Sequence, residues 1–147
     1  MKPREKAAIA VGLLKKEYPD AICSLTETEP FRLLVAVRLS AQCTDKRVNE
    51  VTPVLFRVFP TTEAMAAAKG EDVERIIRPC GFYHGKARDI VECANVLLNE
   101  YGGVIPDDID TFSAFCSAGC REWGVKRQIC SSATCTAEMP WCATRIL

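Results

Sequence analysis

Residues Pro30–Asp45 read PFRLLVAVRLSAQCTD, and this stretch determines the fold that the sequence predicts. Pro30 suits the first position of a helix, where its missing N–H costs nothing. The apolar run Leu33–Val37 follows without a polar residue, which is typical of a helix that is buried on all sides. The run ends in the polar segment Ser40–Thr44 and then Asp45, which suits the N-cap of the next helix. Polar side chains at the mouth of a buried helix are a common place for function.

The composition is that of one globular domain of 147 residues, with 48% apolar and 26% charged residues. Nineteen basic and nineteen acidic residues cancel, whereas nucleic-acid-binding domains usually carry a basic excess or a basic face. No apolar stretch reaches membrane-spanning length, and the charged start of the chain lacks the apolar middle of a signal peptide. We therefore expect a cytoplasmic protein that does not contact a membrane.

Helical periodicity recurs along the first two-thirds of the chain, without a convincing strand pattern. We expect helices over residues 3–17, 30–39, 45–59, 63–68, 73–78 and 86–101. Tyr18-Pro19 ends the first, because the residue before a proline avoids helical angles. Pro53 is expected to kink or interrupt the third, and Gly102-Gly103 to end the last. Short loops between about six helices predict a compact all-α domain.

A second informative loop, Cys80–Ala87 (CGFYHGKA), places two aromatic residues and His84 between two glycines. The helix that follows carries Lys86 and Arg88 in its first turn. Aromatic residues on a tight loop beside cations suit stacking on bases and contacts with phosphates. From this motif alone, a hydrophobic plug beneath a turn is the preferred interpretation, and His84 alone is weak evidence of catalysis.

Three motifs occur together in the order and spacing of one family: Pro30–Asp45, Gly81–Ala87 and Gly103–Asp108. Over roughly residues 13–110 the chain resembles endonuclease III, a bifunctional DNA glycosylase and AP lyase of base excision repair. The resemblance implies a helix-hairpin-helix glycosylase fold, with a six-helix barrel domain and a second domain that holds a [4Fe–4S] cluster. It also implies action on oxidised pyrimidines, and double-stranded DNA with a damaged or abasic site as the partner.

The resemblance further implies which residues contact DNA. Gln42 matches the glutamine that fills the gap left by a flipped-out base, and Phe82 stands where the family places an apolar wedge. Base extrusion costs a few kcal/mol, and inserted side chains compensate by replacing the lost stacking and pairing. Thr44 and Asp45 are interpreted as holding the turn that aims Gln42. The predicted DNA-binding set is Gln42, Thr44, Phe82, Tyr83, His84 and Lys86.

The chemistry of the family requires sequence motifs that residues 112–147 do not contain. It uses a hairpin, Leu-Pro-Gly-Val-Gly-Arg-Lys-Thr-Ala, an aspartate in Val-Asp-Thr-His, and four cluster cysteines. Residues 112–147 contain no Gly-x-Gly and no aspartate. We therefore expect an endonuclease III-like helical region over 1–111 and a non-homologous, poorly ordered tail over 112–147. The expected chain lacks the iron–sulfur domain, has no catalytic residue, cofactor or metal ligand, and is inactive.

The tail also suggests a hypothesis about the gene. Read one nucleotide earlier, the codons permitted for Cys120–Cys130 can spell Leu-Pro-Gly-Met/Val-Gly-Arg-Lys-Thr-Ala-Asn-Leu, which is the missing hairpin. Cys142–Ile146 can likewise spell Val-Cys-Asp-Thr-His. We interpret the tail as an out-of-frame reading, with the shift between about Thr111 and Gly119; the DNA sequence of that region tests it. Lys126 overlaps the codon of the family's lysine, but its neighbours differ, so it receives no role.

Two other interpretations stay open. The chain can be a non-catalytic fragment that binds DNA weakly through Gln42, Phe82 and Lys86. It can also be a small metal-binding or redox protein built on the five cysteines of residues 116–142, although their spacings match neither zinc patterns nor the family's cluster. Without the second domain, the first helix lacks its docking surface, so we expect exposed apolar surface and self-association.

Overall fold

The computed structural model describes residues 2–22, 24–108, 111 and 114–115. All regular structure in this part of the chain is helical, which confirms the all-α prediction. The elements are α1 (Pro3–Glu17), α2 (Pro30–Leu39), α3 (Asp45–Val58), α4 (Thr62–Ala66), α5 (Gly70–Ile77), the 3₁₀-helix η1 (Arg78–Cys80) and α6 (Tyr83–Tyr101).

Helix α2 is buried, as its apolar run predicts. Pro30 occupies its first turn, and the Glu29 carboxylate caps its N-terminus by accepting hydrogen bonds from the backbone N–H groups of Phe31 and Arg32 at 3.3 and 2.9 Å. Its buried side chains are Phe31, Leu33, Leu34, Val35, Ala36 and Leu39. Leu39 and Ser40 at its C-terminal end are buried as well, and the chain reaches the surface at Gln42.

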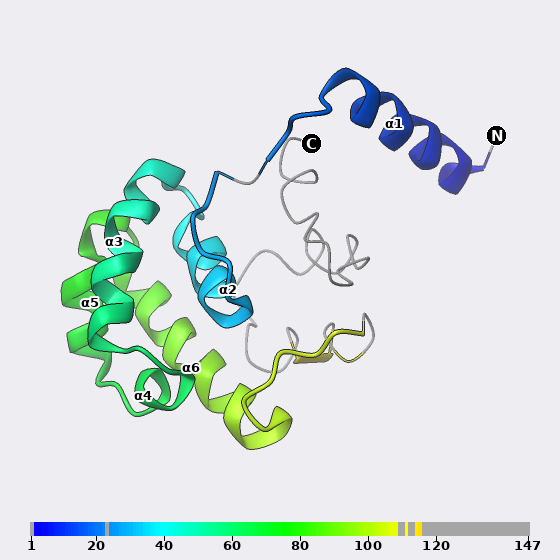
Figure 1. Ribbon diagram of the computed structural model, residues 1–147. Coiled ribbons are helices and arrows are strands. Elements are labelled where there is room, and N and C mark those ends of the chain that lie inside the picture. Colours follow the sequence, from blue (N-terminus) through cyan, green and yellow to red (C-terminus); the bar gives the residue numbers. More distant parts are fainter. Residues whose placement is uncertain (1, 23, 109–110, 112–113, 116–147) are drawn as a thin grey trace.

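Helix α6 is the longest element and contacts α2, α4, α5 and η1 (Figure 1). Its fully buried side chains recur at intervals of three and four residues, which places them on one face. The apolar ones are Ala87, Ile90, Cys93, Ala94 and Leu97. The helix begins at Tyr83, three residues before the expected start, and ends at Gly102 in the left-handed conformation.

Helix α3 has a different N-cap from the expected one, and it continues through Pro53. Thr44, and not Asp45, is the N-cap: its hydroxyl accepts a hydrogen bond from the backbone N–H of Arg47. Pro53 lies inside the helix, which continues to Val58, so the expected interruption does not occur. The Pro53 side chain is exposed, so its ring requires no space in the core.

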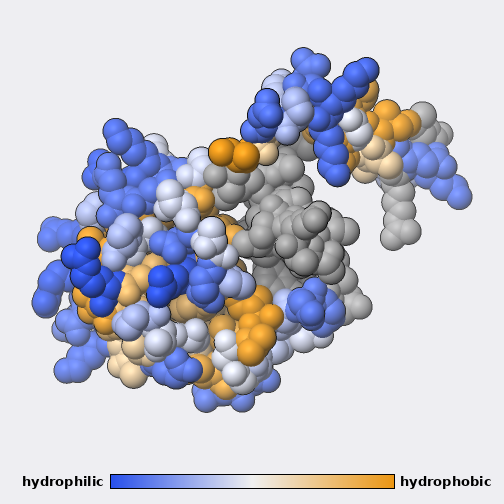
Figure 2. Space-filling model, viewed as in Figure 1, coloured by the Kyte–Doolittle hydropathy of each residue, from blue (hydrophilic) through white to orange (hydrophobic). Residues whose placement is uncertain are grey.

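Helix α1 lies apart from the body formed by α2–α6 (Figure 1). Its apolar side chains are largely exposed, including Ile9 at 51% and Leu13 at 63%, and Figure 2 shows apolar side chains on its surface. This agrees with the predicted exposed apolar surface, whereas self-association stays a prediction. Among the described residues, no helix has the length and apolar character needed to cross a membrane.

The predicted poorly ordered tail, residues 112–147, lies outside the described residues except for 114–115. Phe115 is fully buried, and its ring meets the Tyr101 ring edge-on, with centroids 5.3 Å apart. This contact places residue 115 against the C-terminal end of α6.

Candidate functional site

Two loops carry the residues that the sequence places at the DNA. The Gln42 loop is residues 40–44 between α2 and α3, and the Phe82 loop is residues 78–82 between α5 and α6. Gln42 has φ 52° and Phe82 has φ 48°, and within the described ranges these are the only non-glycine residues with positive φ. A left-handed conformation costs a non-glycine residue about 1–2 kcal/mol. Strain of this kind concentrates at functional sites.

Both strained residues present their side chains to solvent. Phe82 is 72% exposed, which is unusual for a large apolar side chain, and Gln42 is also exposed. Phe82 is the N-cap of α6, but its side chain accepts no hydrogen bond there, and the first turn of α6 has no acidic residue. The partly positive N-terminus of α6 is therefore not neutralised by its own first turn, a setting that favours an anion.

Lys86 lies beneath the two loops and not at the surface. Its side chain is among the largest fully buried ones, with 1% exposure, and burial lowers its pKa. The Lys86 ammonium donates hydrogen bonds to the carbonyl oxygens of Leu39 at 2.8 Å and Cys80 at 2.9 Å. Leu39 is the last residue of α2 before the Gln42 loop, and Cys80 belongs to the Phe82 loop. This corrects the expectation that Lys86 contacts DNA: its charged group is used inside the protein.

Two further contacts connect the same regions. Arg38, in the last turn of α2, donates to Asp89 of α6 from Nε at 3.0 Å and from Nη2 at 2.6 Å. The Cys43 and Cys80 thiols interact: burial, followed by the neighbouring Cys43, raises the pKa of Cys80 to about 11. The C-terminal end of α2, the Gln42 loop and the Phe82 loop therefore form one connected unit.

The other predicted residues have different surroundings. Thr44 uses its hydroxyl to cap α3, which agrees with the role of holding the turn. Tyr83 is half-buried against the core, with the Arg78 guanidinium 5.9 Å from its ring centroid. The His84 side chain is 75% exposed, and its Nδ1 lies 2.8 Å from Oε2 of Glu74. Gln42, Thr44, Phe82 and His84 are the exposed members of the set, and of these the Thr44 hydroxyl already caps α3 and the His84 imidazole lies against Glu74.

Sequence reasoning missed two cations beside the loops. Arg47, in the first turn of α3, is exposed and close enough for its charge to act on the Cys80 thiol. Arg78 is exposed at the start of the Phe82 loop. The available signal was their position, each within five residues of a strained residue. The Arg47 Nε lies 3.8 Å from Oε2 of Glu50, which partly balances its charge, and the Arg78 guanidinium lies over the Tyr83 ring.

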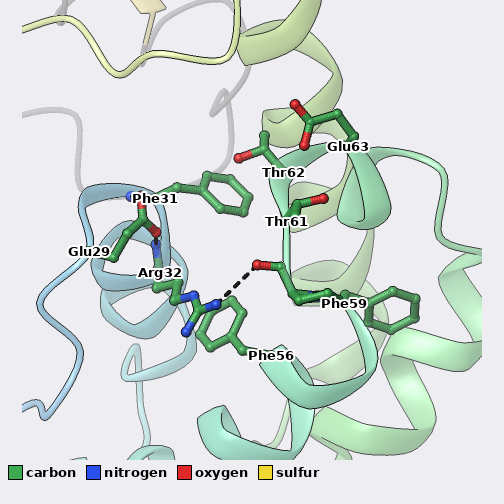
Figure 3. A pocket seen from close by; sticks show the side chains of 9 residues that line it. Glu29, Phe31, Arg32, Phe56, Phe59, Thr61, Thr62 and Glu63 are labelled. Carbon is green, nitrogen blue, oxygen red and sulfur yellow. Dashed lines mark hydrogen bonds between the residues drawn. The ribbon is translucent and has the colours of Figure 1, made fainter.

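A pocket of about 200 Å³ lies at the N-terminal end of α2, at the other end of this helix from the Gln42 loop (Figure 3). Its charged groups already have partners. Glu29 caps α2, while Arg32 donates to the Pro60 carbonyl at 3.0 Å and stacks over Phe56 at 5.1 Å. We therefore do not assign this pocket to the functional site.

The described residues contain no group of three or more His, Cys, Asp or Glu that could hold a metal ion. The cysteines that the structure describes are Cys43 and Cys80, at the two loops, and Cys93, in the core face of α6. This set does not fit the four-cysteine cluster that the resemblance implies. The five cysteines of residues 116–142 lie outside the described part of the chain.

A family model described as the HhH-GPD superfamily base excision DNA repair protein matches residues 35–131. The chain belongs to the HhH-GPD superfamily. This HhH-GPD chain is 40% identical over 107 residues to endonuclease III of Synechocystis sp., covering 73% of this chain and 49% of the relative. It is 41% identical over 93 residues to endonuclease III of Bacillus subtilis, covering 63% and 42%. The chain spans about half the length of these curated relatives.

Solved structures agree with this assignment. A non-covalent endonuclease III–DNA complex is 34% identical with a TM-score of 0.70, and the match covers 91% of this chain and 61% of that one. A trapped endonuclease III–DNA covalent intermediate is 35% identical with a TM-score of 0.67, covering 89% and 62%. The predicted resemblance is confirmed. The family match extends beyond the expected boundary at residue 111, and the boundary itself stays a prediction.

Proposed function

We propose that this HhH-GPD chain binds double-stranded DNA at a damaged or abasic site by inserting Gln42 and Phe82 into the base stack. The observation that carries the proposal is the pair of exposed left-handed residues on loops that are joined beneath the surface. The relatives are named endonuclease III, and two similar structures are endonuclease III bound to DNA. An apolar ring and an amide replace the stacking and pairing of an extruded base.

The orientation of the two side chains suits this role physically. Phe82 is apolar and yet keeps 72% of its surface in solvent. Exposed apolar surface of this kind contributes favourable free energy only when a binding partner removes it from water. Arg47 and Arg78 stand beside the loops as candidates for phosphate contacts, which position a protein on the duplex without reading its sequence.

Fluorescence anisotropy with a labelled duplex tests the proposal. The chain should prefer a duplex with one abasic analogue over the intact duplex, and Phe82→Ala should weaken the abasic complex roughly tenfold, because base–aromatic stacking contributes about 1–3 kcal/mol. The matched control is Val104→Ala, which removes another exposed apolar side chain, 71% exposed, away from the loops. Equal losses in the two variants, or equal binding to both duplexes, would refute insertion.

The salt dependence of binding tests the phosphate contacts. Two contacts predict a slope of log K against log salt concentration of about −2, because each neutralised phosphate contributes about 0.9. Arg47→Gln or Arg78→Gln should each reduce the magnitude of the slope by about 1. An unchanged slope in both variants would remove these residues from the interface.

We further propose that the chain of 147 residues binds without excising a base. A lyase of this type needs a lysine whose free amine can attack the sugar. Lys86 has the lowered pKa that such a nucleophile requires, but its ammonium is buried and donates to two carbonyl groups. A sugar carbon cannot reach it without displacement of both loops. Lys86 is therefore held as a structural group and is not placed to act as the nucleophile.

Borohydride trapping on abasic DNA tests the absence of this chemistry. A lyase that forms a Schiff base yields a covalent protein–DNA adduct under these conditions, and we expect none from this chain. Lys86→Met serves as the internal control if an adduct forms. Any adduct from the unchanged chain would refute inactivity, and an adduct that survives Lys86→Met would show that the nucleophile lies elsewhere in the chain.

A further inference from the structure

We propose that Lys86 is a positioning residue that joins the Gln42 loop to the Phe82 loop, so that both side chains meet DNA as one rigid unit. The predicted effect on DNA binding rests on the proposed function. The connection between the two loops is a property of the protein without DNA. One ammonium group donates to Leu39 in front of one loop and to Cys80 within the other.

The position of Lys86 in its own helix does not explain why a lysine stands there. It lies in the first turn and a half of α6, where the helix dipole disfavours a cation. Its ammonium instead reaches the C-terminal end of α2, where the dipole favours a cation and the last carbonyl groups lack helical partners. The charge therefore serves α2 and the loops, and not the helix that carries it.

Burial adds to this reasoning. Lys86 is 1% exposed and sits on the same face of α6 as Ile90 and Leu97, so an apolar side chain would fill the space without the desolvation of a charge. Burial also lowers its pKa, which reflects this cost. A costly group that makes two directed hydrogen bonds contributes what an apolar residue cannot, namely fixed geometry between two segments.

The two segments that Lys86 joins are also the two that hold strained residues. Gln42 follows Leu39 by three positions and Phe82 follows Cys80 by two, and both are left-handed. A residue in this conformation relaxes unless its surroundings fix it. The hydrogen bonds from Lys86 fix the backbone three residues before Gln42 and two residues before Phe82, which keeps the exposed side chains in a defined relative orientation.

Hydrogen exchange of the free protein tests the joining directly. The backbone N–H of Cys43 donates to Ser40 and that of Gly81 donates to Arg78, so these two amides report on the two loops. In Lys86→Met both amides should exchange roughly tenfold faster, as expected for the loss of a hydrogen bond to a charged group. Amides in the second half of α6 should keep their rates. The matched control, Lys46→Met, removes an exposed lysine next to the Gln42 loop and should change neither loop.

Each other outcome overturns the proposal. Faster exchange in only one loop, or equally faster exchange throughout α6, would make Lys86 an ordinary structural residue. If Lys86→Met does not fold, Lys86→Gln, which keeps an N–H donor, replaces it, and loss of folding in both variants would show that Lys86 supports the whole body and not the loops.

Binding to the abasic duplex separates this proposal from the proposed function. In the unchanged protein the losses of binding free energy from Gln42→Ala and Phe82→Ala should be non-additive, because the two side chains act as one unit. In the Lys86→Met background the two losses of binding free energy should become additive. A chain that shows the predicted exchange but no preference for the abasic duplex would refute the proposed function and leave the joining role intact. Additive losses in both backgrounds would refute the joint action on DNA.

Discussion

Replacement of Phe82 by glycine and by alanine should reverse the usual order of stability of these two residues. Phe82 is left-handed, so glycine removes a cost of about 1–2 kcal/mol that alanine keeps. Glycine adds an entropic cost of about 0.5–1 kcal/mol. Both variants lose the small buried part of the ring, worth about 0.7 kcal/mol, because the side chain is 72% exposed and full burial is worth about 2–3 kcal/mol.

These values predict that Phe82→Gly is more stable than Phe82→Ala by about 0.5–1 kcal/mol and nearly as stable as the unchanged protein. Urea unfolding followed by circular dichroism at 222 nm measures the difference. The control pair is Ala87→Gly, in the interior of α6, where glycine should be the less stable residue. If Phe82→Ala were the more stable variant, residue 82 would not be held in the left-handed conformation, and the assignment of strain to this loop would be wrong.

Three further predictions concern other parts of the chain. Arg38→Met should destabilise the fold by about 3 kcal/mol, because it leaves the nearly buried Asp89 without its main partner, whereas Arg38→Met combined with Asp89→Leu should recover part of this loss; urea unfolding measures both. Burial raises the pKa of Cys80 to about 11, so above pH 9 the unfolded chain loses this proton first; stability should fall between pH 9 and 11, and less steeply in Cys80→Ala. Ile9→Ser combined with Leu13→Ser should reduce the predicted self-association, and sedimentation velocity should show a smaller weight-average mass than for the unchanged chain, with equal masses excluding α1 as the cause.

The arrangement of α2 could be predicted from the sequence because local and global signals agree there. Pro30 sets the start, the apolar run demands burial on all sides, and the polar segment after Leu39 ends the helix. Pro53 was harder to place. A proline usually interrupts a helix, but on the exposed side of α3 only one hydrogen bond is lost, and packing of the buried face carries the helix onward.

The error about Lys86 has an identifiable origin. The expected helix started at residue 86, which made Lys86 a first-turn residue next to solvent. The helix in fact starts at Tyr83, and Lys86 then shares its face with Ile90, Cys93 and Leu97 at spacings of four, seven and eleven. This spacing was readable from the sequence, but a lysine in register with a core face is normally an exception. What could not be read was the pair of carbonyl groups that receives its charge, because they come from α2 and η1.

The features of this fold that reduce its stability, two left-handed residues and one buried charge, lie at one place in the structure. Their common position indicates a shared functional constraint. A sequence selected only for stability would place glycine at positions 42 and 82 and an apolar residue at position 86. Instead two residues keep left-handed strain and a third keeps a buried charge, all where the C-terminal end of α2 meets the start of α6. If displacement of a base is the constraint that maintains them, Gln42→Gly should raise stability by about 0.5–1 kcal/mol while it weakens the abasic complex. A change of the same sign in both quantities would instead make the strain an ordinary consequence of how the loops close.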